Sequence, residues 1–167
     1  MWLKIQLAYD TLSDPAKRRR YDSTLPFDDS IPEKDEFKDD TFYSVFDEVF
    51  ERNSMWALKK PAPRIGDAHT PMEDVRAFYK YWNNFEGWRE FAQHHEHKPD
   101  EAQDRYERRW MEGENKKVSK KYEKEERARM IELAETAYQN DPRIRAELAE
   151  IEAEKNRVKQ QKKDFKA

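Results

Sequence analysis

The stretch "FYSVFDEVF", residues 42 to 50, carries the strongest helical pattern in the sequence. Its apolar side chains recur at intervals of three and four residues, which places them on one face of an α-helix. These side chains are Phe42, Val45, Phe46, Val49 and Phe50. A helix with so wide an apolar stripe has to bury it, so we predict that residues 42 to 50 lie in the core.

A second helix is predicted after "KKPAPRIGDAH", residues 59 to 69, a stretch rich in residues that favour turns. Thr70 and Glu73 have the spacing of a capping box, and Pro71 suits the first position of the helix. The apolar face continues through Val75, Phe78, Tyr79, Trp82 and Phe85. After a bend, "GWREF", residues 87 to 91, predicts another aromatic helix, and we expect both to pack against the helix at 42 to 50.

The rest of the chain also indicates helices. Residues 101 to 139 contain no proline and many helix formers, so we predict a long helix interrupted only at Gly113. Asp141 and Pro142 then form an N-cap and first-turn pair that opens another helix. Its apolar stripe is thin, which predicts a solvent-exposed course: Ile144, Leu148, Ile151, Val158 and Phe165. Because strand-like alternation is absent, the fold class is all-α: a small, aromatic-cored helical bundle with a long charged C-terminal helix.

At the N-terminus the sequence predicts a helix, a corner and a second helix. Ile5, Ala8, Tyr9 and Leu12 share one face, and this helix must end before Pro15. Asp14 is expected to cap the next helix. Residues 23 to 40 follow as a connector, with Phe27 and Ile31 as its anchors.

Composition narrows the classes of function. Of the 167 residues, 41% are charged and 36% hydrophobic, while the net charge is only −3, so a partner has to be chosen by local patches. The chain has no cysteine and three glycines, and it lacks phosphate-loop and hydrolase motifs. No apolar run approaches the roughly 20 residues of a membrane span. We therefore expect a soluble, non-secreted protein that is not an enzyme, with no cofactor, small-molecule substrate or membrane partner.

The best candidate for a binding surface lies on the helix around residues 105 to 129. On an ideal wheel of about 100° per residue, its cations gather in one sector, with Met111, Val118 and Tyr122 nearly opposite. The sector contains Arg105, Arg109, Lys116, Lys120 and Arg127, with Lys117 and Lys124 beside it. Such spacing matches the phosphates of a nucleic-acid backbone, and A-form RNA is read mainly through shape and phosphates. Charge alone, however, favours an ordinary solvated face.

Two other groups of residues have side chains suited to a metal site or to base stacking. His94, His95, His97 and Asp100 include metal-binding residue types, but adjacent histidines diverge on a helix, so a polar loop is the preferred interpretation. No metal site is expected. An aromatic set has the chemistry to stack bases, although the helical spacing of most of its members favours core packing: Trp56, Phe78, Trp82, Trp88 and Trp110. Trp56 lies in a predicted loop, and its role is left open.

Two resemblances to known families sharpen these predictions. "AYDTLSDPAKRRRYD", residues 8 to 22, resembles the second half of a J-domain, whose third helix ends in a pattern like A-Y-x-x-L-S-D-P and whose fourth contains K-R-x-x-Y-D. The His-Pro-Asp tripeptide with which J-domains stimulate DnaK-class chaperones is absent from the sequence. We expect these J-domain remnant helices to be either loosely ordered or packed on the region that follows.

The remainder resembles the zuotin family, the J-proteins of the eukaryotic ribosome-associated complex. The matching segments occur in the family's order: "FDDSIP" (27 to 32), "VFERN" (49 to 53), "FYKYWNNFEGWREF" (78 to 91), "ERRWME" (107 to 112) and "DPRI" (141 to 144). The resemblance divides the chain into a J-domain remnant at 1 to 23, a zuotin homology region at 24 to 141, and the start of a long charged helical segment at 142 to 167.

The zuotin resemblance implies docking near the exit of the nascent-chain tunnel, through large-subunit ribosomal RNA and a neighbouring tunnel-exit protein. The full-length protein would position a DnaK-class chaperone there for co-translational folding. Family members carry basic contacts just after the R-R-W-M-E-like motif, although Ser119 and Glu123 stand here where more basic members carry Arg or Lys. The candidate ribosome-binding residues are Arg105, Arg108, Arg109, Lys116, Lys117, Lys120, Lys121, Lys124 and Arg127.

Two alternatives remain open at this point. A related J-protein of ribosome biogenesis shares the F-Y-x-Y-W and M-E-x-E-N-K-K patterns, but "FDDSIP" and "VFERN" favour zuotin. A helical spacer without a ligand of its own would also explain the high charge and the long C-terminal helix.

Overall fold

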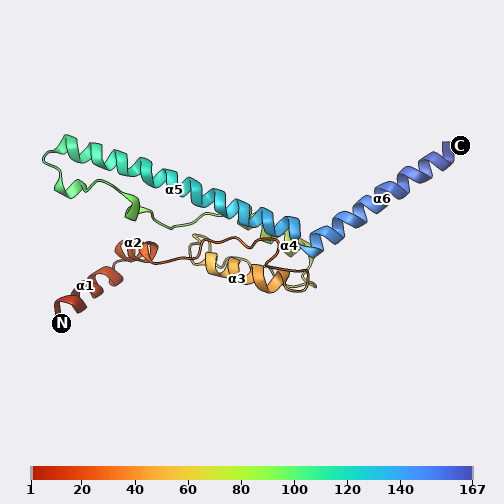
Figure 1. Ribbon diagram of the computed structural model, residues 1–167, viewed down its shortest axis with the longest axis horizontal. Helices are drawn as coiled ribbons and strands as arrows, with labels where there is room; N and C mark the ends of the chain where they lie inside the picture. Colours follow the sequence, from red (N-terminus) through yellow and green to blue (C-terminus); the bar gives the residue numbers. More distant parts are fainter. Residues whose placement is uncertain (1, 167) are drawn as a thin grey trace. The chain divides into compact units, whose positions relative to one another are not determined.

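The computed structural model describes residues 2 to 166, and it confirms the all-α prediction (Figure 1). Its helices are α1 (Trp2–Ser13), α2 (Pro15–Thr24), α3 (Phe42–Ser54), α4 (Met72–Asn83), α5 (Arg105–Asn140) and α6 (Pro142–Lys166). Two short 3-10 helices, η1 (Ala92–His94) and η2 (Pro99–Glu101), lie between α4 and α5. The remaining segments of the described chain are turns and extended connections.

The chain folds as two compact units that alternate along the sequence. The first unit contains the residues up to Ser30, then Trp56–Lys60 and Phe85–Arg129. The second unit contains Ile31–Met55, Pro61–Asn84 and the residues from Met130 onward. Helix α5 therefore contributes its N-terminal two-thirds to the first unit and its remainder to the second.

The aromatic core predicted from residues 42 to 50 lies in the second unit. Phe42, Phe46, Val49 and Phe50 are all buried on α3. The ring centroid of Phe50 lies 4.8 Å from that of Phe78 and 4.8 Å from that of Trp82, so α4 packs on α3 as predicted. The Trp82 indole N–H donates to the Pro63 carbonyl at 3.1 Å, which satisfies the polar edge of this buried ring.

The predicted capping box at the start of α4 does not form. Helix α4 begins at Met72, and the Thr70 hydroxyl instead accepts the Asp67 N–H at 2.9 Å. This bond closes the turn from 67 to 70, next to Gly66, whose φ of +75° suits glycine. The hydroxyl is therefore already engaged on the turn, and the first turn of α4 relies on Glu73 and Asp74 facing the helix dipole.

The Asp141 cap of α6 is confirmed, and it belongs to a buried polar group in the second unit. Asp141 Oδ1 accepts the Arg143 N–H at 2.9 Å, while Asp141 Oδ2 receives the Tyr79 hydroxyl at 2.8 Å and Arg143 Nη2 at 2.7 Å. Arg143 also donates to the Ile65 carbonyl at 3.0 Å. Burial, followed by the Asp141 charge, raises the pKa of Tyr79, so its hydroxyl remains a donor.

In the first unit, "GWREF" is extended, so the helix predicted for residues 87 to 91 is wrong. Gly87 forms an isolated antiparallel bridge with Ala57, and the Trp88 N–H donates to the Trp56 carbonyl at 2.9 Å. A Cβ at Gly87 would lie 3.1 Å from the Phe85 ring and 3.4 Å from the Trp56 carbonyl. The close approach of the two backbones, which glycine permits, outweighs the helical spacing of the aromatic residues.

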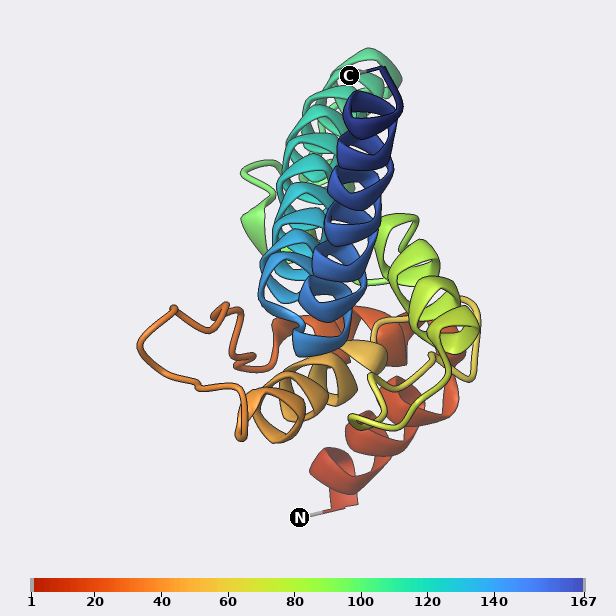
Figure 2. The ribbon, with the colours of Figure 1, turned by 90° about the vertical axis from the view of Figure 1, so that its right-hand side faces the viewer.

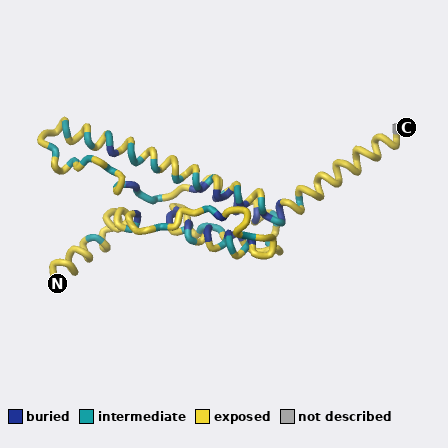
Figure 3. The backbone as a smooth tube through the Cα atoms, in the orientation of Figure 1, coloured by how far each residue is buried: buried dark blue, intermediate teal, exposed yellow. Residues whose placement is uncertain are grey.

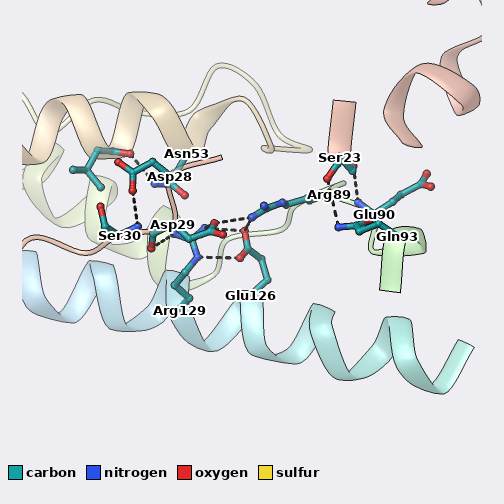
Figure 4. Close-up of polar contacts among 11 residues, drawn as sticks. Ser23, Asp28, Asp29, Ser30, Asn53, Arg89, Glu90, Gln93, Glu126 and Arg129 are labelled. Carbon is teal, nitrogen blue, oxygen red and sulfur yellow. Dashed lines mark hydrogen bonds and ion pairs between the residues drawn. The ribbon is translucent and has the colours of Figure 1, made fainter. Parts of the chain in front are cut away.

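The N-terminal helices form as predicted, and Asp14 caps α2 by accepting the N–H groups of Ala16 and Lys17, both at 2.9 Å. Within the described chain, α1 buries no residue, whereas Ser23 at the end of α2 is buried. Its hydroxyl accepts the Glu90 N–H at 2.9 Å, a contact that Figure 4 displays. The J-like stretch is therefore attached to the rest of the first unit at its C-terminal end.

Helix α6 is exposed along nearly its whole described length beyond the first turn (Figure 3). Four members of its predicted thin stripe are exposed, including Leu148 at 53% and Phe165 at 94%, whereas Ile144 in the first turn is buried at 3%, so the exposed course predicted for Ile144 is wrong. Among the described helices, none combines the length and apolar character that crossing a bilayer requires.

Candidate nucleic-acid interface

Helix α5, which Figure 2 draws as one unbroken helix, carries all the predicted cations. It continues without interruption through Gly113. Nothing lies within 4 Å of the position that a Cβ at Gly113 would take. All nine predicted residues are exposed, and we call this set the basic face: Arg105, Arg108, Arg109, Lys116, Lys117, Lys120, Lys121, Lys124 and Arg127. The interruption expected at Gly113 is therefore absent, and the face is presented on a single helix.

Three members of the basic face are partly neutralised by nearby carboxylates. The pairs are Arg108 with Glu112 at 3.2 Å and Asp100 at 3.6 Å, Lys117 with Glu114 at 2.6 Å, and Lys121 with Glu125 at 4.0 Å. All of these pairs are exposed, and such pairs contribute little energy and yield readily to a stronger anion.

The other six members of the basic face make no ion pair within the part of the chain that the structure describes. They are Arg105, Arg109, Lys116, Lys120, Lys124 and Arg127. Lys116, Lys120 and Lys124 are each four residues apart, so they form one ridge along the helix surface. The unpaired charges repel one another at this spacing, which means that an external polyanion would stabilise the helix that carries them.

The opposite side of α5 is fixed by a loop that contains the three histidines. The His94 ring stacks on Tyr122 with centroids 3.8 Å apart, and His95 Nε2 lies 2.7 Å from Ser119 Oγ. His97 packs against Trp110 instead, with ring centroids 4.7 Å apart. Each histidine has a different partner, and no group of three potential metal ligands converges in the described residues.

Burial lowers the pKa of His95, with smaller contributions from the positive charges of Arg20 and His94. The imidazole of His95 therefore favours its neutral form, which suits the hydrogen bond to Ser119 at neutral pH.

Asn115 is a positioning residue that the sequence analysis missed. It is 5% exposed, its amide N–H donates to the His97 carbonyl at 2.8 Å, and its carbonyl accepts the His97 N–H at 3.3 Å. This pairing ties the loop to α5 on the side that carries Met111, Val118 and Tyr122. A polar residue on the inward side of the helical wheel was the available signal for it.

An ion-pair cluster that sequence reasoning also missed lies near the C-terminal end of the basic face (Figure 4). Glu126 Oε1 lies 3.3 Å from Arg89 Nη1 and 2.8 Å from Arg129 Nη2. The side chain of Arg89 also contacts Asp29 at 2.7 Å and is only 11% exposed. Because these arginines are held by carboxylates, they belong to the scaffold and not to the basic face.

Arg89 also completes the aromatic core of the first unit. Its guanidinium lies 4.9 Å from the ring centroids of both Phe27 and Trp56. Trp56 in turn packs against Trp88 with centroids 4.9 Å apart. Trp56, whose role the sequence left open, is thus a core residue at 2% exposure, and Phe27 anchors the connector as expected.

Trp110 does not follow the same pattern. It is 55% exposed, and Tyr106, one turn earlier on α5, is 88% exposed. The prediction of core packing is therefore wrong for Trp110, because this part of α5 carries only a loop on one side and has no helix to cover the ring. Two aromatic side chains thus accompany the first cations of the basic face.

Comparison with known proteins bears directly on this surface. The sequence profile described as "Zuotin-like, zuotin homology domain" matches residues 41 to 145. The chain belongs to the zuotin-like family. The matched range includes α3, α4, the whole of α5 and the Asp141 cap, so the basic face lies inside the zuotin homology domain.

Named relatives agree with this assignment. DnaJ homolog subfamily C member 2 from Bos taurus is 48% identical over 142 residues, which cover 84% of this chain and 23% of that protein. Zuotin from Saccharomyces cerevisiae is 35% identical over 141 residues, covering 84% of this chain and 32% of zuotin. DnaJ homolog subfamily C member 21 from Homo sapiens is 30% identical over 187 residues. The chain thus spans about a quarter to a third of these relatives.

Proposed function

We propose that this chain is the ribosome-docking part of a J-protein co-chaperone and that the basic face of α5 binds ribosomal RNA. One observation carries the proposal: six exposed cations without ion pairs share one surface of a helix whose other side is held by the histidine loop. Membership of the zuotin-like family supports it, as do relatives named zuotin and DnaJ homolog.

The physical basis is phosphate recognition by a rigid row of charges. Each Lys or Arg that meets a phosphate releases condensed counterions, so affinity falls as salt rises. Six such contacts predict a slope of about −5 in log affinity against log salt, or roughly a thousandfold loss between about 50 mM and 200 mM salt. A-form RNA suits this surface because its phosphates can be bound without base-specific motifs.

The docking site is proposed to lie near the exit of the nascent-chain tunnel, on large-subunit RNA and an adjoining tunnel-exit protein. In the full-length protein this location would hold a DnaK-class chaperone close to emerging chains, in the cytoplasm. The division into residues 1 to 23, 24 to 141 and 142 to 167 then assigns docking to the middle segment. The J-like helices and the charged α6 then flank the docking segment.

Co-sedimentation of the chain with ribosomes at low and moderate salt tests the proposal. We expect binding at low salt that weakens steeply as salt rises. Absence of binding at low salt would contradict docking and favour the spacer interpretation.

The co-chaperone part of the proposal has a separate test. The chain lacks the His-Pro-Asp tripeptide, so by itself it should not stimulate the ATPase of a DnaK-class chaperone, whereas the full-length protein should. Stimulation by the 167-residue chain alone would contradict this assignment.

A second candidate is a J-protein that acts in ribosome biogenesis. It is favoured by "MEGENKK", residues 111 to 117, which fits the M-E-x-E-N-K-K pattern. Sedimentation with precursor particles but not with mature ribosomes would select it.

A further inference from the structure

Tyr106 and Trp110 are large aromatic side chains that α5 presents to solvent. Their exposures are 88% and 55%, and their spacing of four residues places them side by side on the helix. Trp110 is held at one side by the His97 ring, whose centroid is 4.7 Å away, and Asn115 fixes the backbone of His97. The indole is therefore supported from within the first unit while part of its surface stays open.

Two arginines run beside this aromatic pair. Arg105 and Arg109 each precede an aromatic residue by one position, so the four side chains form two adjacent ridges. Both arginines are exposed and make no ion pair within the described chain. They line an open groove of about 720 Å³, whose other lining residues are Pro99, Asp100, Ala102, Gln103, Asp104, Arg108 and Glu112.

Nearby carboxylates are engaged locally. Glu107 accepts the Gln103 N–H at 2.6 Å, Asp104 accepts the Glu107 N–H at 2.8 Å, and Glu112 pairs with Arg108. None of these carboxylates forms an ion pair with Arg105 or Arg109 in the described chain, so both arginines can pair with an incoming anion.

We propose that Tyr106 and Trp110 stack on unpaired RNA bases while Arg105 and Arg109 bind the adjoining phosphates. This inference rests on the proposed function, in which the basic face binds ribosomal RNA. Base stacking on aromatic side chains is favourable for every base, and it requires bases that have left the helical stack. The RNA that contacts the first turns of α5 is then a loop or bulge. The ridge formed by Lys116, Lys120 and Lys124 binds phosphates whether or not the bases are paired. Charge complementarity favours RNA over an apolar protein segment as the occupant, because the aromatic pair is bordered by cations.

The test compares two double variants of the 167-residue chain. Tyr106→Leu with Trp110→Leu removes both rings, and Tyr106→Phe with Trp110→Phe retains aromatic faces at the same positions. Two RNA probes are titrated at the same salt, namely a hairpin with an unpaired loop and a blunt duplex of equal length. Circular dichroism verifies that both variants keep their helices, which the exposure of the two positions leads us to expect.

We expect the leucine variant to lose about tenfold or more in affinity for the looped hairpin and to bind the duplex within about twofold of the unsubstituted chain. The phenylalanine variant should retain most of the loop affinity. Equal losses on both probes, or no loss on either, would overturn the stacking assignment while leaving phosphate docking intact.

Two further outcomes separate the remaining possibilities. If the leucine variant lost ribosome binding but kept its affinity for both RNA probes, the aromatic pair would contact a protein, and the proposal would be wrong. If the unsubstituted chain bound neither RNA at low salt, RNA docking by the basic face would itself be contradicted.

Discussion

Arg89 and Glu126 form an ion pair that is almost closed to solvent, with 3.3 Å between Nη1 and Oε1. Arg127, the next residue on α5, is exposed and makes no ion pair in the described chain. Two adjacent residues of α5 therefore have different roles. Glu126 stabilises the fold through its ion pairs, whereas Arg127 is exposed and available to bind a partner. This separation predicts that variants of the two kinds of arginine will differ in what they change.

Replacing Arg89 with alanine should lower the free energy of unfolding by about 2 to 4 kcal/mol, because it removes a nearly buried partner of Glu126 and the cation over two aromatic rings. Arg127→Ala should change it by less than about 0.5 kcal/mol. Urea unfolding followed by circular dichroism measures both values. Equal stabilities for the two variants would show that the Arg89 cluster is not a structural element.

Tyr79→Phe removes the hydroxyl that donates to Asp141 at 2.8 Å. We expect a loss of about 1.5 to 3 kcal/mol in unfolding free energy, since Asp141 is fully buried and loses one charge-assisted hydrogen bond. Tyr106→Phe is the matched control on an exposed ring and should leave stability unchanged. A Tyr79→Phe protein as stable as the control would refute the role assigned to this bond.

The stability of the first unit should fall as the pH drops below neutrality. The folded-state pKa of His95 lies below its ordinary value of 6.5, so the unfolded chain binds more protons between these two values. Stability is therefore retained above about pH 6.5 and is lost as pH falls toward the folded-state pKa. An NMR titration of the His95 ring measures that pKa directly, and His95→Gln should weaken the pH dependence. A folded-state pKa above 6.5 would reverse the predicted sign.

Gly113→Ala should stabilise α5 by up to about 1 kcal/mol, because alanine is the better helix former and its methyl group would meet nothing within 4 Å. Thermal unfolding by circular dichroism provides the measurement. A destabilised variant would indicate that the helix does not run straight through this position.

The periodic parts of the fold were predictable from sequence. The stripes at Phe42 to Phe50 and at Val75 to Trp82 specified two helices and their packing because each is wide and unambiguous. Caps at Asp14 and Asp141 followed from the proline after each aspartate. The same reasoning failed at Gly87, where a backbone pairing 30 residues away in sequence replaced the expected helix.

The candidate site was likewise predictable from sequence only in part. Helical spacing indicated which side of α5 is basic for seven of the cations, Arg108 and Lys121 were added by the zuotin resemblance, and all nine are exposed. Spacing did not reveal which cations are paired, because the partners of Arg89 and Arg129 include Asp29, far away in the sequence. Exposure of Trp110 was equally hidden, since an aromatic residue carries the same pattern whether or not another element covers it.

The most direct test of the central claim is ribosome binding by a variant with Lys116, Lys120 and Lys124 replaced by glutamine. A control variant carries the same charge change at Lys155, Lys159 and Lys162, which are exposed on α6 outside the matched zuotin homology domain. Measured over a range of salt, the first variant should bind ribosomes more weakly, with a salt slope reduced in magnitude by about three, while the control should match the unsubstituted chain. Equal affinity and equal salt slope for the two variants would contradict docking through the basic face of α5.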